Sequence, residues 1–317
     1  MSATAWLTQF LEVLAALAAA PLFVGWVTQC RAWLQNKSAP SLLQPYRTIR
    51  KLFHKDAVLA EHASPLFRFA PYVVFGAMVC MTAIIPSMGT GLPFSGAADA
   101  IALVGLLATA RVFMALAAMD VGTAFGSLGA RREMMVGFLA EPALLMVIFV
   151  AALISSSTAL PAITDSLATQ PRGLYPSLAF TAVAFLLVLL AENARIPVDN
   201  PATHLELTMI HEAMLLEYSA RHLALMEWAS ALKLFNYACI GFALFVPWGL
   251  ATGAAPDPVA LLTALPLLAV KLAVAGAGLA VIETVSAKLR VFRAPEFLAA
   301  AFMLAVLGLL VHLLLGA

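Results

Sequence analysis

Residues 174–219 read LYPSLAFTAVAFLLVLLAENARIPVDNPATHLELTMIHEAMLLEYS, an uncharged apolar run up to Ala191 followed by a segment rich in acids and histidines. The apolar part has about the length that a helix needs to cross the ~30 Å hydrocarbon layer of a membrane. The polar part concentrates ionisable side chains in a chain that is otherwise poor in them, namely Glu192, Arg195, Asp199, His204, Glu206, His211, Glu212 and Glu217. A connection of this kind predicts a role in moving protons or in coupling to a redox partner.

Composition places the whole chain in the membrane. The 317 residues are 63% hydrophobic and only 11% charged, whereas a soluble domain has about 25% charged residues. The cysteines, Cys30, Cys80 and Cys239, form no CxxC pair, so the sequence has no iron–sulfur or zinc signature. We expect Cys80 and Cys239 to be small core residues. No cleavable signal peptide pattern precedes the first apolar run.

The fold class that this predicts is an all-α, polytopic membrane protein forming one domain over residues 1–317. Eight apolar runs can span the bilayer: about 4–28, 69–86, 99–119, 134–155, 174–191, 231–250, 259–283 and 295–315. Lys and Arg fall almost entirely in alternate connections, which the positive-inside rule assigns to the cytoplasm: 29–68, 120–133, 192–230 and 284–294. Both termini are therefore expected outside, and localisation in the cytoplasmic (inner) membrane follows.

The connections differ between the two sides. The outward ones, about 87–98, 156–173 and 251–258, are short and look like plain turns. On the cytoplasmic side, residues 42–53 (LLQPYRTIRKLF) place apolar side chains at helical spacing opposite basic ones. This pattern predicts an interfacial helix that lies on the membrane or docks on a partner.

Ionisable residues inside spans are costly, so each is a functional candidate. Glu141 lies beside Pro142 in the fourth span, and packing alone does not explain a carboxylate at that position. For Arg111 in the third span, a buried ion pair that orients helices is the leading interpretation. The remaining candidates are Asp120, Lys233, Lys271 and Glu283. Glu12 and His312 lie toward the outer ends of their spans and are expected to be incidental.

If residues 201–218 are helical, Glu206 and Glu217 lie within about 20° of one face and ~16 Å apart along the axis, which suits a relay through water. A carboxylate whose pKa is raised by low dielectric exchanges protons near neutral pH. His204 and His211 share another face, but HEAML is not HExxH, so no metal site is expected. The chain is expected to hold no redox centre of its own.

These motifs resemble the quinone-site membrane subunit of respiratory complex I, whose pattern is roughly AExxRxPFD, then ExEL, then EYS. The matching positions are Glu192, Arg195, Pro197, Asp199, Glu206, Leu207, Glu217, Tyr218 and Ser219. Arg132 and Glu141 match the Rx8E of the fourth span, and Asn36 with residues 42–53 matches the first loop. Eight spans with external termini are also the family's layout, so the resemblance covers nearly the whole chain.

The departures from that pattern point to a particular branch. Val198 replaces the usual Phe, and residues 200–204 (NPATH) replace further acids. About three extra residues separate Asp199 from Tyr218, and SAPSLLQPY replaces a Gly-rich GPYGLLQP. The runs KLRVFRAPEFLAAAF and RIPVDNPATHLELTMIHEA are more similar to the homologous subunit of group 4 nickel–iron hydrogenases and formate hydrogenlyases. These departures disfavour quinone binding.

The resemblance implies a non-catalytic membrane anchor beneath a cytoplasmic hydrogenase module. Nickel–iron and iron–sulfur centres would belong to the partner subunits, which are the hydrogenase large and small subunits and an iron–sulfur protein, with antiporter-like subunits in the membrane. Our first hypothesis makes the chain a coupling subunit with a proton path or coupling residues at Glu141, Glu192, Asp199, Glu206, Glu212, Glu217, Asp120, Lys271 and Glu283. The residues expected to tune these charges or bind the docked module are Arg131, Arg132, Arg195, Arg111, Arg290 and Arg293.

Two alternatives remain open. The chain could be the quinone-binding subunit of a complex I-type NADH:quinone oxidoreductase, with the same acids responding to quinone chemistry. It could also be a structural scaffold in which the buried charges are helix-orienting pairs and no ion moves.

Overall fold

The computed structural model describes residues 3–60, 62–169, 175–199, 210–251, 258–287, 289 and 293–315, and these residues form helices, turns and two isolated bridges. The long helices are α1 (Ala3–Leu34), α3 (Pro65–Ile84), α4 (Ala100–Asp120), α5 (Ala124–Ser155), α7 (Pro176–Glu192), α9 (Ala220–Phe245), α10 (Pro258–Val285) and α11 (Ala294–Leu315). The short ones are α2 (Gln44–Phe53), η1 (Ser95–Ala97), α6 (Leu160–Thr169) and α8 (His211–Leu215). The all-α polytopic fold is confirmed.

Each predicted span corresponds to one long helix. Seven of them are long and apolar enough to cross a membrane, while α7, with 17 residues, is shorter. Local sequence fixes where three of them begin, because a side chain caps the first turn. The Ser64 hydroxyl accepts from Leu66 N (3.1 Å) and the Asp99 carboxylate from Ile101 N (2.9 Å). The Thr123 hydroxyl accepts from Gly126 N (3.3 Å) in the same way.

Two helices begin ten or more residues earlier than predicted. α5 begins at Ala124 rather than at residue 134, so Arg131 and Arg132 lie on the helix and not in a loop over 120–133. α9 begins at Ala220 rather than at residue 231. The prediction trimmed both helices because it followed the apolar run, whereas the backbone continues helically through charged turns at the inner end.

Two further expectations, for residues 156–173 and for Cys80, were wrong, and the helix considered over 201–218 lies partly outside the described residues. Residues 156–173 are not a plain turn, because they contain α6. The helix predicted over 201–218 is found only at His211–Leu215 among the described residues, and Glu217 lies in the turn that follows it. Residues 200–209, with His204 and Glu206, lie outside the described residues. Cys80 is exposed, while Cys239 is buried as expected.

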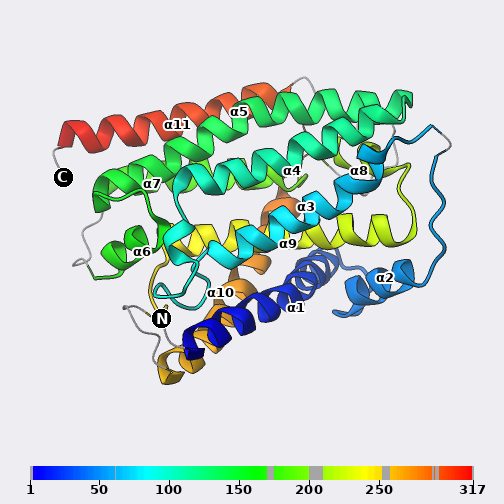
Figure 1. Ribbon diagram of the computed structural model, residues 1–317. Coiled ribbons are helices and arrows are strands. Elements are labelled where there is room, and N and C mark those ends of the chain that lie inside the picture. Colours follow the sequence, from blue (N-terminus) through cyan, green and yellow to red (C-terminus); the bar gives the residue numbers. More distant parts are fainter. Residues whose placement is uncertain are drawn as a thin grey trace.

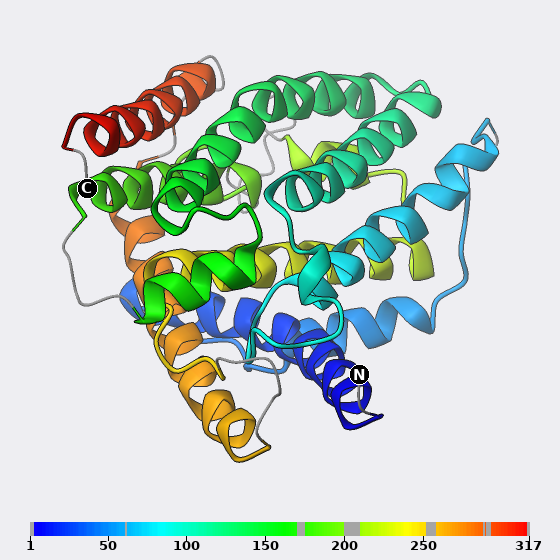
Figure 2. The same ribbon diagram turned by 60° about the vertical axis from the view of Figure 1, so that its left-hand side comes forward.

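The long helices run roughly side by side between two ends of the molecule (Figure 1). One end carries α2 and α8, and the other carries α6 and both termini, as the predicted sidedness requires. α9 packs against α1, α2, α3, α6 and α7 and is the most buried span. α11 lies at the edge against α5 and α7 (Figure 2). Lys233 and Asn236 of α9 therefore lie inside the bundle.

A helix, α2, is found within the range 42–53 where the sequence predicted an interfacial helix. Ile49 is buried, Tyr46 is partly buried, and Arg47, Arg50 and Lys51 are exposed. The buried face packs on α9 and α1. The apolar face of α2 is therefore held against the bundle and its basic face is exposed. Burial also raises the pKa of the Tyr46 hydroxyl.

Candidate functional site

A cluster of charged side chains from four helices lies in the bundle interior. Arg111 of α4 forms ion pairs with Glu141 of α5 and Glu192 of α7, and its Nε lies 3.5 Å from Glu133 Oε1. Lys233 Nζ of α9 lies 3.0 Å from Glu192 Oε2. We call these five residues the central cluster. It holds three carboxylates and two cations, so it carries one formal negative charge in excess when all are ionised.

Burial differs among the three carboxylates. The Glu192 side chain is 1% exposed and that of Glu133 is 8% exposed, whereas that of Glu141 is 29% exposed. Arg111 itself is 4% exposed. Buried charges are tolerated only when they are paired. Here the Arg111 guanidinium is the shared partner of three carboxylates. Glu141 is therefore the member of the cluster that is most open to exchange with the surroundings.

Gly137 provides the space in which Arg111 lies. It stands one helical turn from both Glu133 and Glu141 on α5. A Cβ at this position would lie 2.6 Å from Arg111 Cδ and 2.7 Å from Arg111 Cζ. The guanidinium thus packs directly on the backbone of α5, between the two carboxylates of that helix.

The loop after α7 continues from the cluster to the inner surface. Asp199 is 3% exposed, and its Oδ2 accepts hydrogen bonds from Ile210 N (3.1 Å) and His211 N (3.3 Å). It thereby closes the loop and fixes the start of α8. Burial lowers the pKa of His211, so the neutral imidazole is favoured, and nearby carboxylates including Glu133 oppose this shift.

The EYS motif anchors this loop to the rest of the bundle. The Tyr218 hydroxyl donates to Phe67 O (3.1 Å), and its ring stacks on that of Phe67 with centroids 4.1 Å apart. Burial raises the pKa of Tyr218. The Ser219 hydroxyl donates to Val58 O (2.6 Å) and accepts from Val58 N (2.9 Å). Tyr218 therefore holds the loop against α3, and Ser219 holds it against the connection between α2 and α3.

A second ion cluster lies at the inner end of α10. Glu283 is 3% exposed and lies 3.0 Å from Arg195 Nη1 and 3.4 Å from Arg31 Nη1. Leu289 N also donates to Pro197 O (2.8 Å) in the same region. These contacts tie the loop after α7 to the ends of α1 and α10. Arg195 is thus paired with Glu283. From the sequence, Glu283 was expected among the coupling residues and Arg195 among the residues that tune charge or bind the docked module.

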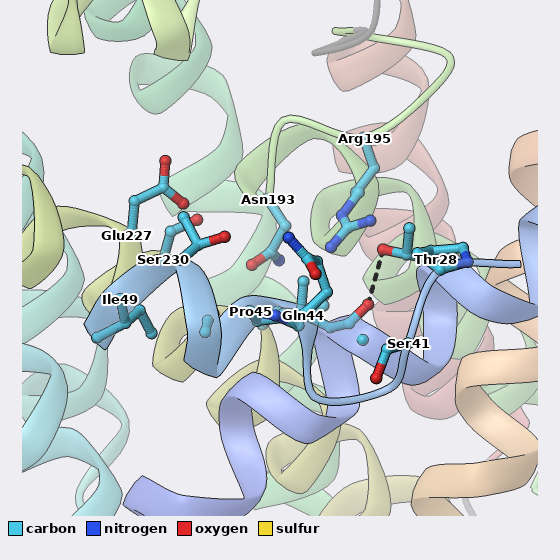
Figure 3. A pocket seen from close by; sticks show the side chains of 15 residues that line it. Thr28, Ser41, Gln44, Pro45, Ile49, Asn193, Arg195, Glu227 and Ser230 are labelled. Carbon is cyan, nitrogen blue, oxygen red and sulfur yellow. Dashed lines mark hydrogen bonds between the residues drawn. The ribbon is translucent and has the colours of Figure 1, made fainter. Parts of the chain in front are cut away.

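A cavity of about 310 Å³ lies between α1, α2, α9 and the start of the loop after α7. Figure 3 shows Asn193 and Gln44 near its middle, with Glu227 and Ser230 to one side and Arg195 to the other. Its walls also include apolar side chains such as Ile49. Ser230 lines in addition a much smaller cavity whose other walls include Arg111, Glu133, His211 and Lys233. The two cavities therefore share Ser230 of α9 as a wall residue.

The other predicted site residues lie apart from the central cluster. Asp120 Oδ2 accepts from Ser64 N (2.8 Å), and Lys271 Nζ donates to Val246 O (2.6 Å). Glu212 and Glu217 are partly buried at the inner surface, and Arg132 is partly buried on α5. Arg131 and Arg293 are exposed. Glu206 and Arg290 lie outside the described residues.

Sequence reasoning missed several residues. Glu133 was assigned to a loop, yet its spacing from Glu141, two helical turns, was a usable signal once α5 is extended. Lys233 was noticed at the start of a span but not assigned to a site, and Glu227 was not noticed. Glu12 was expected to be incidental, but it is 3% exposed and accepts three hydrogen bonds. Among the described residues, no group of three or more His, Cys, Asp or Glu is placed to hold a metal ion.

Comparison with known proteins gives the family. The family model described as NADH dehydrogenase matches residues 8–314. Formate hydrogenlyase subunit 4 of Escherichia coli is 34% identical over 94% of this chain and 95% of its own length. Hydrogenase-4 component C of E. coli is 37% identical over 72% of this chain and 71% of its own length.

The fold also has a close counterpart among solved structures. A chain of the membrane-bound sulfane sulfur reductase, an archaeal respiratory membrane complex, superposes with a TM-score of 0.80 at 19% identity, covering 96% of this chain and 98% of that one. At this identity the likeness concerns the fold alone. With the family model matching almost the entire chain, this multi-pass inner-membrane protein belongs to the NADH dehydrogenase family of complex I subunit 1-like proteins.

Proposed function

We propose that this chain is the membrane anchor and coupling subunit of a membrane-bound group 4 nickel–iron hydrogenase or formate hydrogenlyase complex. It links a cytoplasmic hydrogenase module to proton or sodium translocation through buried carboxylates. The nickel–iron and iron–sulfur centres belong to partner subunits on the cytoplasmic face. The names of the two E. coli relatives support this assignment over the other members of the family.

The observation that carries the coupling role is the charge excess of the central cluster. A purely structural network would be expected to balance its charges, because each unpaired buried charge is costly. This cluster instead holds one carboxylate more than its two cations can neutralise. A proton taken up by Glu141 balances the cluster, and its release restores the excess, so the cluster can exist in two protonation states within one fold.

The inner surface supports the anchoring role. The loop after α7 connects the central cluster, through Glu192, to the surface segment that begins with α8. The exposed basic face of α2 lies at the same end of the molecule (Figure 1). A partner docked there would contact the loop that also carries Arg195 and Asp199.

The test is the substitution Glu141→Gln in the assembled complex. Glutamine keeps the size of the side chain and removes its charge, which leaves two carboxylates for two cations. We therefore expect normal complex yield and hydrogen turnover without ion movement. Everted membrane vesicles would be assayed for gas turnover together with a pH-sensitive dye and a sodium tracer.

Glu296→Gln provides the matched control, because Glu296 is exposed in the first turn of α11. This control should keep both turnover and ion movement. Ion movement at the wild-type ratio to gas turnover in Glu141→Gln would contradict the coupling role. The hydrogenase subunits would still be expected to co-purify, since that result depends on anchoring alone.

The 310 Å³ cavity favours one second candidate, a quinone-binding subunit. Its volume falls within the usual range for small-molecule sites, and it combines apolar walls with a few polar groups. Extraction of quinone from the purified complex, or turnover that depends on added quinone, would support this candidate. Full hydrogen turnover in membranes depleted of quinone would count against it.

A further inference from the structure

A buried acid in the outer half of α1 lies outside the central cluster. Glu12 Oε1 accepts hydrogen bonds from Ser87 N (3.1 Å), Ser87 Oγ (2.5 Å) and Met88 N (2.8 Å). Its other oxygen, Oε2, is buried and has no hydrogen-bond partner among the described residues. Ionisable groups at such depth are costly and need a reason to be retained.

Capping the chain after α3 does not require an acid. Gln9, one turn earlier on α1, performs the same kind of task with an amide. Its Nε2 donates to Ala83 O (2.9 Å) and its Oε1 accepts from Phe94 N (3.2 Å). Gln9 is as buried as Glu12, at 3% exposed. A neutral side chain at position 12 could accept the same backbone hydrogen bonds, so the ionisable carboxyl group serves something else.

A small cavity lies next to Glu12. Ser87, which donates to Glu12, lines it together with Cys239 of α9 and Lys271 of α10. About 10 Å³ is open to water-sized molecules, which is room for about one water. Lys271 Nζ donates to Val246 O and has two further protons to offer. Glu12 thus accepts a hydrogen bond from one wall of this space, Ser87, and Lys271 forms another wall.

Polar groups on α9 lead from this cavity to the central cluster. Asn236 is 1% exposed, and its Oδ1 accepts from the Thr82 hydroxyl of α3 (2.9 Å). It lies three residues after Lys233 and three before Cys239, so each step rises about 4.5 Å along the helix. Lys233 belongs to the central cluster and Cys239 lines the outer cavity. The interior of the bundle therefore has polar groups at successive depths.

We infer that Glu12 and Lys271 form the outer proton-exchange site of this subunit. A proton arriving along α9 through water and the Asn236–Thr82 pair is taken up by the Glu12 carboxylate and released to water on the outer side. Lys271 contributes the cation that lines the cavity beside Ser87. The inference rests on the proposed coupling function and adds to it that the path crosses this chain from the inner to the outer half.

The test is Glu12→Gln in the assembled complex, measured in everted vesicles with the pH-sensitive dye. We expect retained complex yield and gas turnover, with proton movement reduced to the level seen with an uncoupler. Glu12→Asp, which keeps the ionisable group, should restore part of the movement. Gln9→Ala is the matched control: it removes a buried cap one turn away and should leave protons moved per hydrogen unchanged.

The outcomes separate this inference from the proposed function. Normal proton movement in Glu12→Gln, with movement lost in Glu141→Gln, overturns the outer site and leaves the coupling role standing. Normal movement in both variants overturns both. If Glu12→Gln does not assemble, Lys271→Met decides, because the partly buried lysine can be replaced by an apolar side chain of similar length. Normal proton movement in that variant overturns the outer site.

Discussion

Replacing Arg111 by methionine removes the one cation that contacts all three carboxylates of the central cluster. Methionine has a similar length and no charge, so the cavity left behind is small. After the change Glu192 keeps its ion pair with Lys233, but Glu133 and Glu141 lose the only ion-pair partner found for them in the described chain. The cluster then carries three carboxylates and one cation.

The expected cost follows from burial. Breaking a buried ion pair by removing one partner costs about 3–5 kcal/mol. Arg111 and Glu133 are almost fully buried, so this range applies to them with little screening by solvent, whereas Glu141 is more exposed and adds less. Such a cost is a large part of a typical folding free energy of about 5–15 kcal/mol. It lowers the ratio of folded to unfolded chain by about 10²-fold to about 5 × 10³-fold.

The assay is the yield and melting temperature of the complex purified in detergent. Arg131→Met is the control, because Arg131 is an exposed arginine on the inner part of α5, and it should melt like the wild type. The double variant Arg111→Met with Glu133→Gln should recover part of the loss, since it removes a stranded carboxylate. Wild-type yield and melting temperature in Arg111→Met would refute the reasoning.

Two further predictions concern the surroundings of the cluster. Gly137→Ala should destabilise the complex by about 1–3 kcal/mol, because the added Cβ would meet the Arg111 side chain. In the control Gly278→Ala the added Cβ meets no atom within 4 Å, so the melting temperature should not fall. Equal melting temperatures for the two variants would count against the close approach of Arg111 to Gly137. The lowered pKa of His211 means that the folded state favours the neutral ring, so its contribution is full above the unfolded pKa of about 6.5 and is lost as the pH falls below it. The protection factors of amide exchange in residues 210–219, which correct for the slower intrinsic exchange at lower pH, should accordingly fall more between pH 7.5 and 5.5 in the wild type than in His211→Gln, and an equal fall would contradict the assignment.

The sequence predicted the fold well because span length and the placement of Lys and Arg are properties of each segment alone. The eight predicted spans correspond to eight helices, and the predicted sidedness agrees with the positions of α2, α6 and both termini (Figure 1). The boundaries of α5 and α9 were less predictable. At their inner ends the helix continues into charged turns, and hydropathy cannot distinguish a charged helical turn from a loop.

The partners of the site residues could not be predicted in the same way. Arg111 was expected to form an ion pair, and it does, but its partners come from α5 and α7, between 22 and 81 positions away. Which helices face α4 depends on the packing of the whole bundle. Glu12 shows the same limit: its place near the end of a span suggested access to the membrane surface, while the fold turns it inward against Ser87.

The short segment after α7 explains why the acidic connection is so dense in charges. Glu192 belongs to the central cluster, Arg195 pairs with Glu283, and Asp199 closes the loop that starts α8. These three residues lie within eight positions of one another, yet each reaches a different partner. Because the segment is held at three points, a displacement of α8 at the inner surface also strains the contacts of Glu192. In the proposed coupling role, a partner docked on that surface would act on the central cluster through this segment.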